Sequence, residues 1–260
     1  MALTGGEVRL ERSHDGRVAD VTLSHGRYTV ITWEMRQLMA ERFAEIDRDP
    51  DVQVVVIRSD GEHFSSGGDI AGFMEVDPID LTDLGHDVTA AARSPKPVIA
   101  AIDGYCFGVG LEMVLSCDIR LGTGRTQLAL PEMNLGMIPG SGGTQRLARL
   151  IGLSRAKFHI LSATRIQAQQ ALDWGILSGE LHADRDALNS AADALAQKMA
   201  SLSPAALRTA KEVLDRGVDG PLYTGIELER KAYSMLRATQ DFAEGVKAFG
   251  EKRTPVFTGR

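Results

Sequence analysis

The distribution of apolar residues predicts strands and helices from the start of the chain. Segments 7–13 and 18–24 flank the residues HDGR, whose Asp-Gly pair is typical of a hairpin turn, so we expect two antiparallel strands. Residues 33–49 then place apolar side chains at helical spacing with charges between them, which predicts an amphipathic helix packed on a core. These apolar positions are Met35, Leu38, Met39, Phe43 and Ile46.

Strongly apolar segments indicate strands buried in a layered fold. Residues 52–59 (VQVVVIRS) are apolar enough to be covered on both faces, which favours α/β layering. Residues 95–103 (PKPVIAAID) indicate another buried strand. Segments 117–123 and 126–132 read as short strands separated by glycine-rich turns.

The second half of the chain has a different pattern. Residues 141–152 predict a helix with Ser141 as its N-cap, and from Ser154 onward the chain reads as helices almost continuously. No fixed-period repeat occurs there. With 260 residues the chain is able to bury one large core. We expect a core over residues 1–200 and a helical region over 201–260.

Glu112 is the first candidate for chemistry. The segment 109–115 is apolar on every side except at Glu112, a pattern that describes a buried helix. A carboxylate inside such a helix loses its water, which either raises its pKa or requires a partner. A sequence that keeps a carboxylate there is expected to use it.

Glu132 is a second isolated carboxyl. It is the only ionisable group in the apolar run 128–139, on a loop stiffened by Pro131 and Pro139. If Glu112 and Glu132 face one cavity, burial and repulsion would split their pKa values, so that one holds a proton while the other accepts one. The alternative is that each glutamate caps a helix or pairs with an arginine such as Arg120 or Arg146. Two such residues together favour the chemical interpretation.

Two glycine-rich segments offer backbone donors. Residues 63–70 (HFSSGGDI) predict a tight turn in which glycines let N–H groups approach a ligand. Residues 108–110 begin the helix of Glu112, where N–H groups are free and the helix dipole is positive. Two such donors that converge on one carbonyl oxygen would form an oxyanion hole.

Charge and cysteine content narrow the class of protein. The formal net charge of −6 argues against a general nucleic-acid or anionic-membrane surface. Cys106 and Cys117 are the only cysteines, with no CxxC or Cys/His cluster for a metal or disulfide framework. The N-terminus lacks a signal pattern, and no apolar run approaches the ~18 residues that span a bilayer. We therefore expect a cytoplasmic protein without a metal.

Several familiar motifs are incomplete. The GxG at 108–110 is followed by Met113 where a dinucleotide fingerprint needs glycine, and 139–146 lacks the Lys-Ser/Thr pair of a P-loop. No GxSxG elbow or histidine pair beside a glutamate occurs. Asp69 and Asp118, which lie at turns, are expected to fix the backbone.

Four segments resemble the crotonase superfamily, and most closely its enoyl-CoA hydratases. The similarity covers nearly the whole chain, in order and at the spacing of the family. It implies an α/β fold built as a spiral of β-β-α turns with a C-terminal helical trimerisation region. It also implies an acyl-CoA substrate, with coenzyme A as part of that substrate and no separate cofactor. The segments are residues 64–70, 95–122, 130–152 and 244–257.

The resemblance implies a role for each candidate residue. The N–H groups of Gly68 and Val109 would bind the thioester oxygen, Glu112 would activate water, and Glu132 would deliver a proton to the α-carbon. Lys252 matches a lysine that relatives place near the coenzyme A phosphates, often those of a neighbouring subunit; the alternative is a solvated helix end with cations suited to the dipole. The acyl pocket would include Phe73, Met74 and Leu84, for each of which packing in the core is the alternative. The remaining substrate-binding positions are Ser66, Gly67, Asp69, Ile70 and Gly108.

The resemblance also implies self-association as a trimer or a dimer of trimers. The helical region needs a partner to cover apolar positions that we expect to be exposed. These are Leu222, Ile226, Tyr233 and Leu236.

Two departures from the family pattern concern the pocket. Val109 stands where the family usually has glycine; its branched side chain narrows the pocket and limits φ, but its N–H donor is retained. Glu62 stands where many relatives carry a lysine beside the coenzyme A pyrophosphate. We therefore expect an altered substrate shape and a changed pyrophosphate site.

Other functions within the superfamily remain open at this point. Isomerases shift a double bond with one carboxylate, and other relatives hydrolyse the thioester or cleave carbon–carbon bonds. The presence of both glutamates favours hydration of the 2,3 double bond, or the reverse dehydration. One relative binds RNA through a lysine-rich helix, but the corresponding segment here, 36–49, balances basic residues with acidic ones, so RNA binding is disfavoured.

Overall fold

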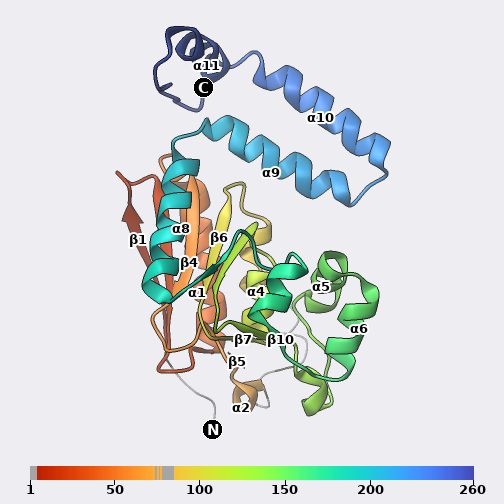
Figure 1. Cartoon of the computed structure of the whole chain (residues 1–260). Helices are drawn as coiled ribbons and strands as arrows, with labels where there is room; N and C mark the ends of the chain where they lie inside the picture. The colour runs from red at the N-terminus through yellow and green to blue at the C-terminus, as the bar shows by residue number, and fades with distance from the viewer. Residues whose placement is uncertain (1–4, 74, 76, 78–84) are drawn as a thin grey trace.

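The structure, a computed structural model, describes residues 5–73, 75, 77 and 85–260. Its centre is a six-stranded sheet with the strand order β1-β2-β4-β6-β8-β11 (Figure 1). Only β1 and β2 are antiparallel; the other neighbours are parallel. The strands are β1 (Glu7–Ser13), β2 (Val18–Ser24), β4 (Val54–Ser59), β6 (Val98–Ile102), β8 (Ile119–Thr123) and β11 (Leu181–His182).

The opening hairpin is confirmed. Strands β1 and β2 pair from Glu7 with Ser24 to Ser13 with Val18, so the turn falls on the expected Asp-Gly segment. Asp15 and Gly16 have φ angles of 57° and 83°, the left-handed conformation that this residue pair tolerates.

After each of the main-sheet strands β2, β4, β6 and β8, the chain forms a short second strand and then a helix. Strands β3 (Val30–Ile31) and β5 (Gly67–Gly68) pair in parallel, as do β7 (Tyr105–Phe107) and β9 (Gln127–Ala129), and β10 (Ile166–Gln167) adds to β9. This succession is the expected spiral of β-β-α turns. The helices of the spiral are α1 (Trp33–Arg48), α2 (Ile70–Phe73), α4 (Val109–Val114) and α5 (Gly143–Ile151).

The main sheet is covered on both faces. Val54 and Val56 of β4 belong to the apolar cluster formed with α8 (Arg185–Ala200), while Val55 and Ile57 belong to the larger cluster on the other face, with α1. Because side chains of a strand alternate between faces, a strand covered on both sides must be apolar throughout. The sequence-based prediction of α/β layering is confirmed.

Helix α1 agrees with its predicted bounds to within one residue. Thr32 caps it by accepting a hydrogen bond from the Met35 N–H, and its buried apolar face includes Met39 and Phe43. Arg36 is buried on the same helix, which the apolar pattern did not predict.

The helix expected at 141–152 is α5, but the prediction that Ser141 caps it is wrong. Its N-cap is Gly142, which has a φ of 93° and no side chain to cap with. Between α5 and the C-terminal helices lie α6 (Leu153–Leu161) and α7 (Ala168–Asp173).

The C-terminal helices lie at the opposite end of the molecule from α2 (Figure 1). They are α9 (Pro204–Val218), α10 (Leu222–Leu236) and α11 (Gln240–Glu251). Of the apolar positions expected on their surface, Leu222, Ile226 and Tyr233 are exposed, whereas Leu236 is half-buried. A domain boundary at residue 200 stays a prediction. Within the described residues, no helix has the length and apolar character needed to cross a bilayer.

Candidate active site

A cavity of about 190 Å³ brings most of the predicted site residues together. Three segments line it: the glycine turn before α2, the start of α4, and the loop from Pro131 to Ser141. Arg36 of α1 completes the wall. The predicted residues among its lining are Ser66, Gly67, Gly68, Ile70, Phe73, Gly108, Val109, Glu112 and Glu132.

Glu112 lies on α4, every residue of which is buried, and is itself only 3% exposed. Its Oε1 accepts hydrogen bonds from the backbone N–H groups of Ser141, at 2.6 Å, and Gly143, at 2.9 Å. The carboxylate therefore caps the start of α5 in place of the Ser141 side chain. Both bonds fall on Oε1, and the part of the chain that the structure describes offers no other hydrogen bond to this side chain, so Oε2 remains available.

Gly143 is a position where close approach excludes a side chain. A Cβ atom added there would lie 3.0 Å from Cγ and Oε1 of Glu112 and equally close to Leu130. A glycine at the first position of α5 thus lets the helix reach the carboxylate.

Glu132 begins a short 3₁₀ helix, η2 (Glu132–Leu135), directly after Pro131. Its Oε2 is buried without a hydrogen-bond partner among the described residues. Burial, together with the negative charge of Glu112, raises the pKa of Glu132 to about 7. A carboxyl with this pKa holds a proton on a substantial fraction of molecules at neutral pH and is suited to donate it.

Neither glutamate forms an ion pair with the arginines considered from the sequence. Arg120 donates to the carbonyl oxygens of Ile176 and Cys117, and Arg146 donates to that of Ser141. Glu112 does cap a helix, as one alternative expected. Within the described residues, neither Glu112 nor Glu132 pairs with an arginine.

The two predicted oxyanion donors lie next to each other. Asp69 N–H donates to Ile31 O on β3, and successive N–H groups of an extended strand point to opposite sides, so Gly68 N–H points away from β3. Val109 is the first residue of α4, where the N–H has no acceptor within the helix. A Cβ atom on Gly68 would lie 3.5 Å from Cγ1 of Val109. Both residues line the cavity, so the two predicted donors lie side by side in its wall.

The glycine turn and α4 are held together by Ser65. Its N–H donates to Tyr105 O and its carbonyl accepts from Phe107 N–H, while its Oγ accepts from Gly67 N–H at 3.1 Å. A Cβ atom on Gly110 would lie 2.7 Å from Cβ of Ser65, so only glycine lets α4 pack this close. The two donor segments therefore have a fixed spacing.

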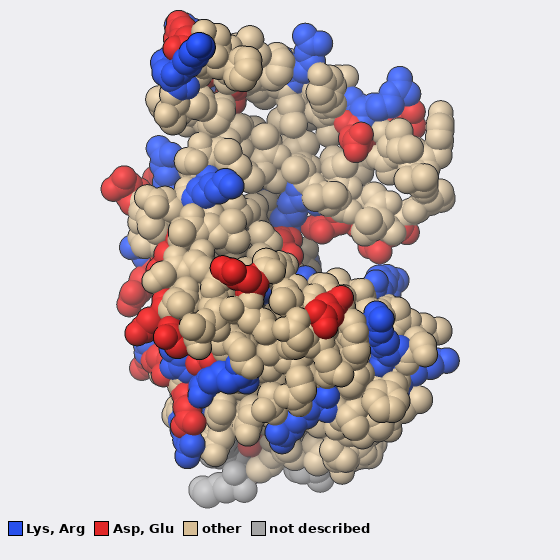
Figure 2. Space-filling model, viewed as in Figure 1, with Lys and Arg blue, Asp and Glu red and all other residues tan. Residues whose placement is uncertain are grey.

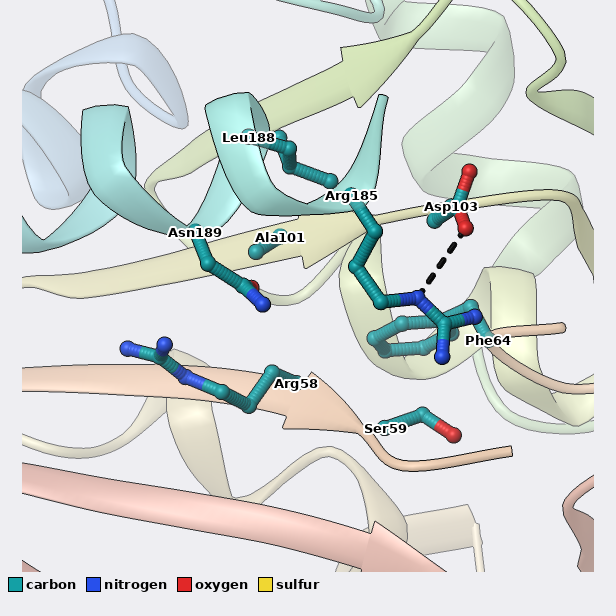
Figure 3. A pocket seen from close by; sticks show the side chains of 8 residues that line it. All are labelled: Arg58, Ser59, Phe64, Ala101, Asp103, Arg185, Leu188 and Asn189. Atoms are coloured by element: carbon teal, nitrogen blue, oxygen red, sulfur yellow. Dashed lines mark hydrogen bonds and ion pairs between the residues drawn. The ribbon is translucent and has the colours of Figure 1, made fainter. Parts of the chain in front are cut away.

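A polar cluster lies at the end of β6, and Figure 3 shows its ion pair between Asp103 and Arg185. Asp103 follows β6 and accepts hydrogen bonds from Thr123 Oγ1 and from the Nε atoms of Arg125 and Arg185. Its carbonyl also accepts from Phe64 N–H, one residue before Ser65. These bonds connect the end of β6, on the way to α4, with the segment between β4 and the glycine turn.

Two predicted site residues, Asp69 and Lys252, lie outside the cavity lining. Asp69 is buried at the end of the glycine turn, directly before α2. Lys252 is the C-cap of α11, with a φ of 55°, and is exposed; helix α11 lies far from α4 within one chain (Figure 1). Glu62, expected to alter the pyrophosphate site, forms an ion pair with Arg27, with 2.5 Å between Oε2 and Nε. Met74 and Leu84, predicted for the acyl pocket, lie outside the described residues.

The sequence interpretation missed Arg36 and the backbone of Ser141. Arg36 follows Met35 and shares a helical face with Met39 and Phe43, so a charge on the apolar face of a helix was the available signal. No comparable signal exists for the Ser141 N–H, because every non-proline residue carries one.

Two further features are the charge on the surface and the arrangement of potential metal ligands. Figure 2 shows Lys and Arg interspersed with Asp and Glu on the viewed face. Across residues 5–73, 75, 77 and 85–260, no group of three His, Cys, Asp or Glu side chains is arranged to hold a metal ion. The expectation that the protein does not bind nucleic acid stays a prediction.

Comparison with known proteins identifies the family. The sequence model described as "Enoyl-CoA hydratase/isomerase" matches residues 14–260. A 2,3-dehydroadipyl-CoA hydratase of Escherichia coli is 40% identical over 214 residues, which are 82% of this chain and 83% of the relative. A short-chain-enoyl-CoA hydratase of Clostridium acetobutylicum is 33% identical over 245 residues, or 92% and 93% of the two chains.

Solved structures show the same fold. An enoyl-CoA hydratase from Bacillus anthracis superposes with a TM-score of 0.90 at 32% identity, covering 97% of this chain and 99% of the other. The predicted α/β crotonase fold with a C-terminal helical region is therefore confirmed, and these relatives show an enzyme of the hydro-lyase class. The chain belongs to the enoyl-CoA hydratase/isomerase family of the crotonase superfamily.

Proposed function

We propose that the protein adds water across the 2,3 double bond of an enoyl-CoA thioester, or catalyses the reverse dehydration. One observation carries this proposal: Glu112 and Glu132 line one cavity together with the oxyanion donors Gly68 and Val109. The two carboxyls have different surroundings, and different surroundings let one group accept a proton while the other donates.

The geometry supports a mechanism in which each proton has a defined route. The thioester oxygen accepts the N–H groups of Gly68 and Val109, which stabilise the negative charge of the enolate. Glu112 removes a proton from water, whose oxygen bonds to the β-carbon. Glu132 gives its proton to the α-carbon. The proton gained by Glu112 then leaves to solvent, and Glu132 is reprotonated.

Isomerisation is the second candidate, because the family description includes it. An isomerase moves one proton between carbons and needs a single carboxylate, so it leaves the second glutamate without a role. Thioester hydrolysis also leaves the acid at the α-carbon unused. Hydration uses both groups.

Incubation with a panel of enoyl-CoA thioesters in water enriched in ¹⁸O, followed by mass spectrometry, distinguishes these reactions. Hydration incorporates ¹⁸O into an intact thioester, isomerisation leaves the mass unchanged, and hydrolysis releases free coenzyme A thiol. If no thioester in the panel gains water, the hydratase proposal is wrong.

We also propose assembly as a trimer or a dimer of trimers. Apolar side chains of α10 and α11 surround a cavity of about 480 Å³ and remain exposed, including Tyr233, Phe242 and Phe249. Exposed apolar patches of this kind mark protein interfaces. Sedimentation at micromolar concentration should show a species of at least three times the 28.1 kDa of one chain. A single species of monomer mass would contradict the proposal.

Lys252 is proposed to contact the coenzyme A phosphates of a neighbouring subunit, because it is remote from its own cavity (Figure 1). A charge-assisted hydrogen bond contributes roughly 1.5–3 kcal/mol, so Lys252→Ala should raise KM by about 10-fold or more with kcat unchanged. An unchanged KM would exclude the contact.

We further place the protein in the cytoplasm. Cys106 and Cys117 are buried free thiols, which is typical of proteins from a reducing compartment. Fractionation of the cells that express the gene, with detection by antibody, tests this location.

A further inference from the structure

A buried arginine lines the cavity beside the proposed oxyanion hole. Arg36 is only 5% exposed, and it lines the same cavity as Glu112 and Glu132. A Cβ atom on Gly68 would lie 2.9 Å from Nη2 of Arg36, so the guanidinium is next to an oxyanion donor. Its Cζ lies 5.1 Å from the centre of the Phe73 ring. The charge is thus held at the reacting end of the cavity.

Burial of a cation without a partner is unfavourable, and buried arginines normally have one. Arg120 illustrates the rule: it is 7% exposed, and its guanidinium donates to Ile176 O and Cys117 O. Arg36 differs. Among the described residues, none accepts a hydrogen bond from its guanidinium, and no carboxylate oxygen lies within the 4.0 Å of an ion pair.

Glu112 is not a hydrogen-bond or ion-pair partner of Arg36. Burial lowers the pKa of Arg36 to about 10, and the charge of Glu112 opposes this shift only in part. The guanidinium therefore stays charged at neutral pH. The Oε1 atom of Glu112 is already bound to the N–H groups of Ser141 and Gly143. The cation keeps its hydrogen-bonding capacity for a group that enters the cavity.

We propose that Arg36 binds a carboxylate on the acyl chain, so that the enzyme prefers enoyl-CoA thioesters whose short acyl group ends in a carboxylate. A guanidinium pairs with a carboxylate through two parallel hydrogen bonds, which makes arginine selective for this planar anion. The proposal rests on the hydratase function and specifies its substrate class.

The other lining residues agree with this chemistry. Leu135, Met137 and Ile138 give the opposite wall an apolar surface that suits the methylene part of an acyl chain. In the proposed mechanism Gly68 holds the thioester oxygen, and Arg36 adjoins Gly68. The terminal carboxylate of the substrate must therefore fold back toward its own thioester, which favours a short acyl chain. The coenzyme A phosphates are excluded as partners, because the oxyanion donors beside Arg36 hold the thioester end of the substrate.

The test compares two substrates matched in length: the mono-CoA thioester of trans-2-hexenedioic acid and trans-2-hexenoyl-CoA. The wild-type enzyme should show a kcat/KM about 10- to 100-fold higher for the first, the range expected from a hydrogen bond to a charged group. This comparison does not depend on how any variant folds. Equal values for the two substrates would overturn the proposal.

Arg36→Met should abolish the preference, because kcat/KM should fall about 10- to 100-fold more for the substrate with the carboxylate than for the neutral one. Arg48→Met is the matched control, because Arg48 is an exposed arginine on the same helix, and this variant should retain the preference. An equal loss by Arg36→Met on both substrates would show that Arg36 serves the fold or the reaction in general, which contradicts substrate recognition. Absence of water addition to either substrate, with every variant, would instead show that the hydratase proposal itself is wrong.

Discussion

The two walls of the cavity hold their carboxyls in different ways. On one wall, α4 is buried at every residue, and Glu112 is fixed by two backbone N–H groups. The facing loop is more open: Leu135, Met137 and Ile138 are 51–63% exposed, and Glu132 keeps a buried oxygen without a partner among the described residues. The same side chain is anchored by backbone N–H groups on one wall and has a pKa of about 7 on the other.

In the proposed mechanism, the surroundings of each carboxyl, and not its chemical type, assign its role. N–H donors stabilise a carboxylate, whereas desolvation without donors favours the protonated acid. Two identical residues can thereby perform opposite proton transfers at one pH. The comparison can be tested by removing each carboxyl, then the oxyanion donor, then the contacts that hold Glu112, and last the charge of Glu132.

The largest effect is expected from Glu112→Gln and Glu132→Gln. Glutamine preserves the shape of each side chain and an oxygen acceptor but cannot transfer the proton, a contribution of typically ~10²–10⁴-fold. Each variant should lower kcat by about this factor with KM nearly unchanged, the mark of a transition-state role. Steady-state hydration kinetics provide the measurement.

An isomerase would respond differently to these two variants. One of them would retain most of its activity, and solvent ¹⁸O would not enter the product. If both variants keep full activity on the best substrate, both glutamates are structural and the division between the two walls has no catalytic meaning.

The second largest loss of kcat is expected from removal of an oxyanion donor. Val109→Pro deletes the N–H at the first position of α4, where proline is well tolerated in a helix. The loss of one such donor costs on the order of 10²–10³-fold in kcat. Val109→Ala is the matched control, since it retains the N–H and should keep kcat within a few-fold. Circular dichroism on both variants checks that the helix persists, and equal kcat values would exclude the Val109 N–H as a donor.

A smaller loss is expected when the anchoring of Glu112 is disturbed. In Gly143→Ala the new Cβ would lie 3.0 Å from the Glu112 side chain and would displace it. Misplacement of a catalytic group by a fraction of an ångström should lower kcat by about 10-fold. Gly124→Ala, where a Cβ meets nothing within 4 Å, should leave kcat unchanged. If the two alanine variants are equally active, the position of Glu112 tolerates movement.

The pH profile examines the charge of Glu132 directly. Hydration requires the protonated acid, so kcat should fall as pH rises through about 7, because burial holds the pKa of Glu132 there. In Glu132→Gln this alkaline limb should be absent from the residual activity. A wild-type profile that is flat between pH 6 and 8, within roughly two-fold, would contradict the assigned role.

The smallest effect concerns stability. The pKa of Glu132 is higher in the folded chain than its ordinary value of 4.5, so its contribution to stability is fully present below pH 4.5 and is lost as pH rises through about 7. The Tm of the wild type should therefore fall relative to Glu132→Gln between pH 5 and 8. The expected change is about 2–4 °C at most, because Glu132 is only partly buried. Differential scanning calorimetry of the two proteins at both pH values measures it.

Much of the architecture follows from local sequence patterns. The continuous apolar character of 52–59 determined a strand buried on both faces, and the spacing of Met35, Met39 and Phe43 determined the core face of α1. The apolar surroundings of Glu112 likewise predicted a buried helix. These inferences succeed because side-chain direction is set by the local period of the backbone, and burial of one face follows from it.

Tertiary structure alone decided how the site is completed. The N–H groups that hold Glu112 come from Ser141 and Gly143, about 30 residues further along the chain. The sequence predicted a cap by the Ser141 side chain, but the left-handed Gly142 turns the backbone so that the N–H groups meet the carboxylate instead. Arg36 lines the cavity next to Gly68 of β5, a strand that pairs with β3 directly before α1. Backbone donors look alike at every residue, and only the pairing of distant strands and the φ angles of a few glycines determine which of them converge on one atom.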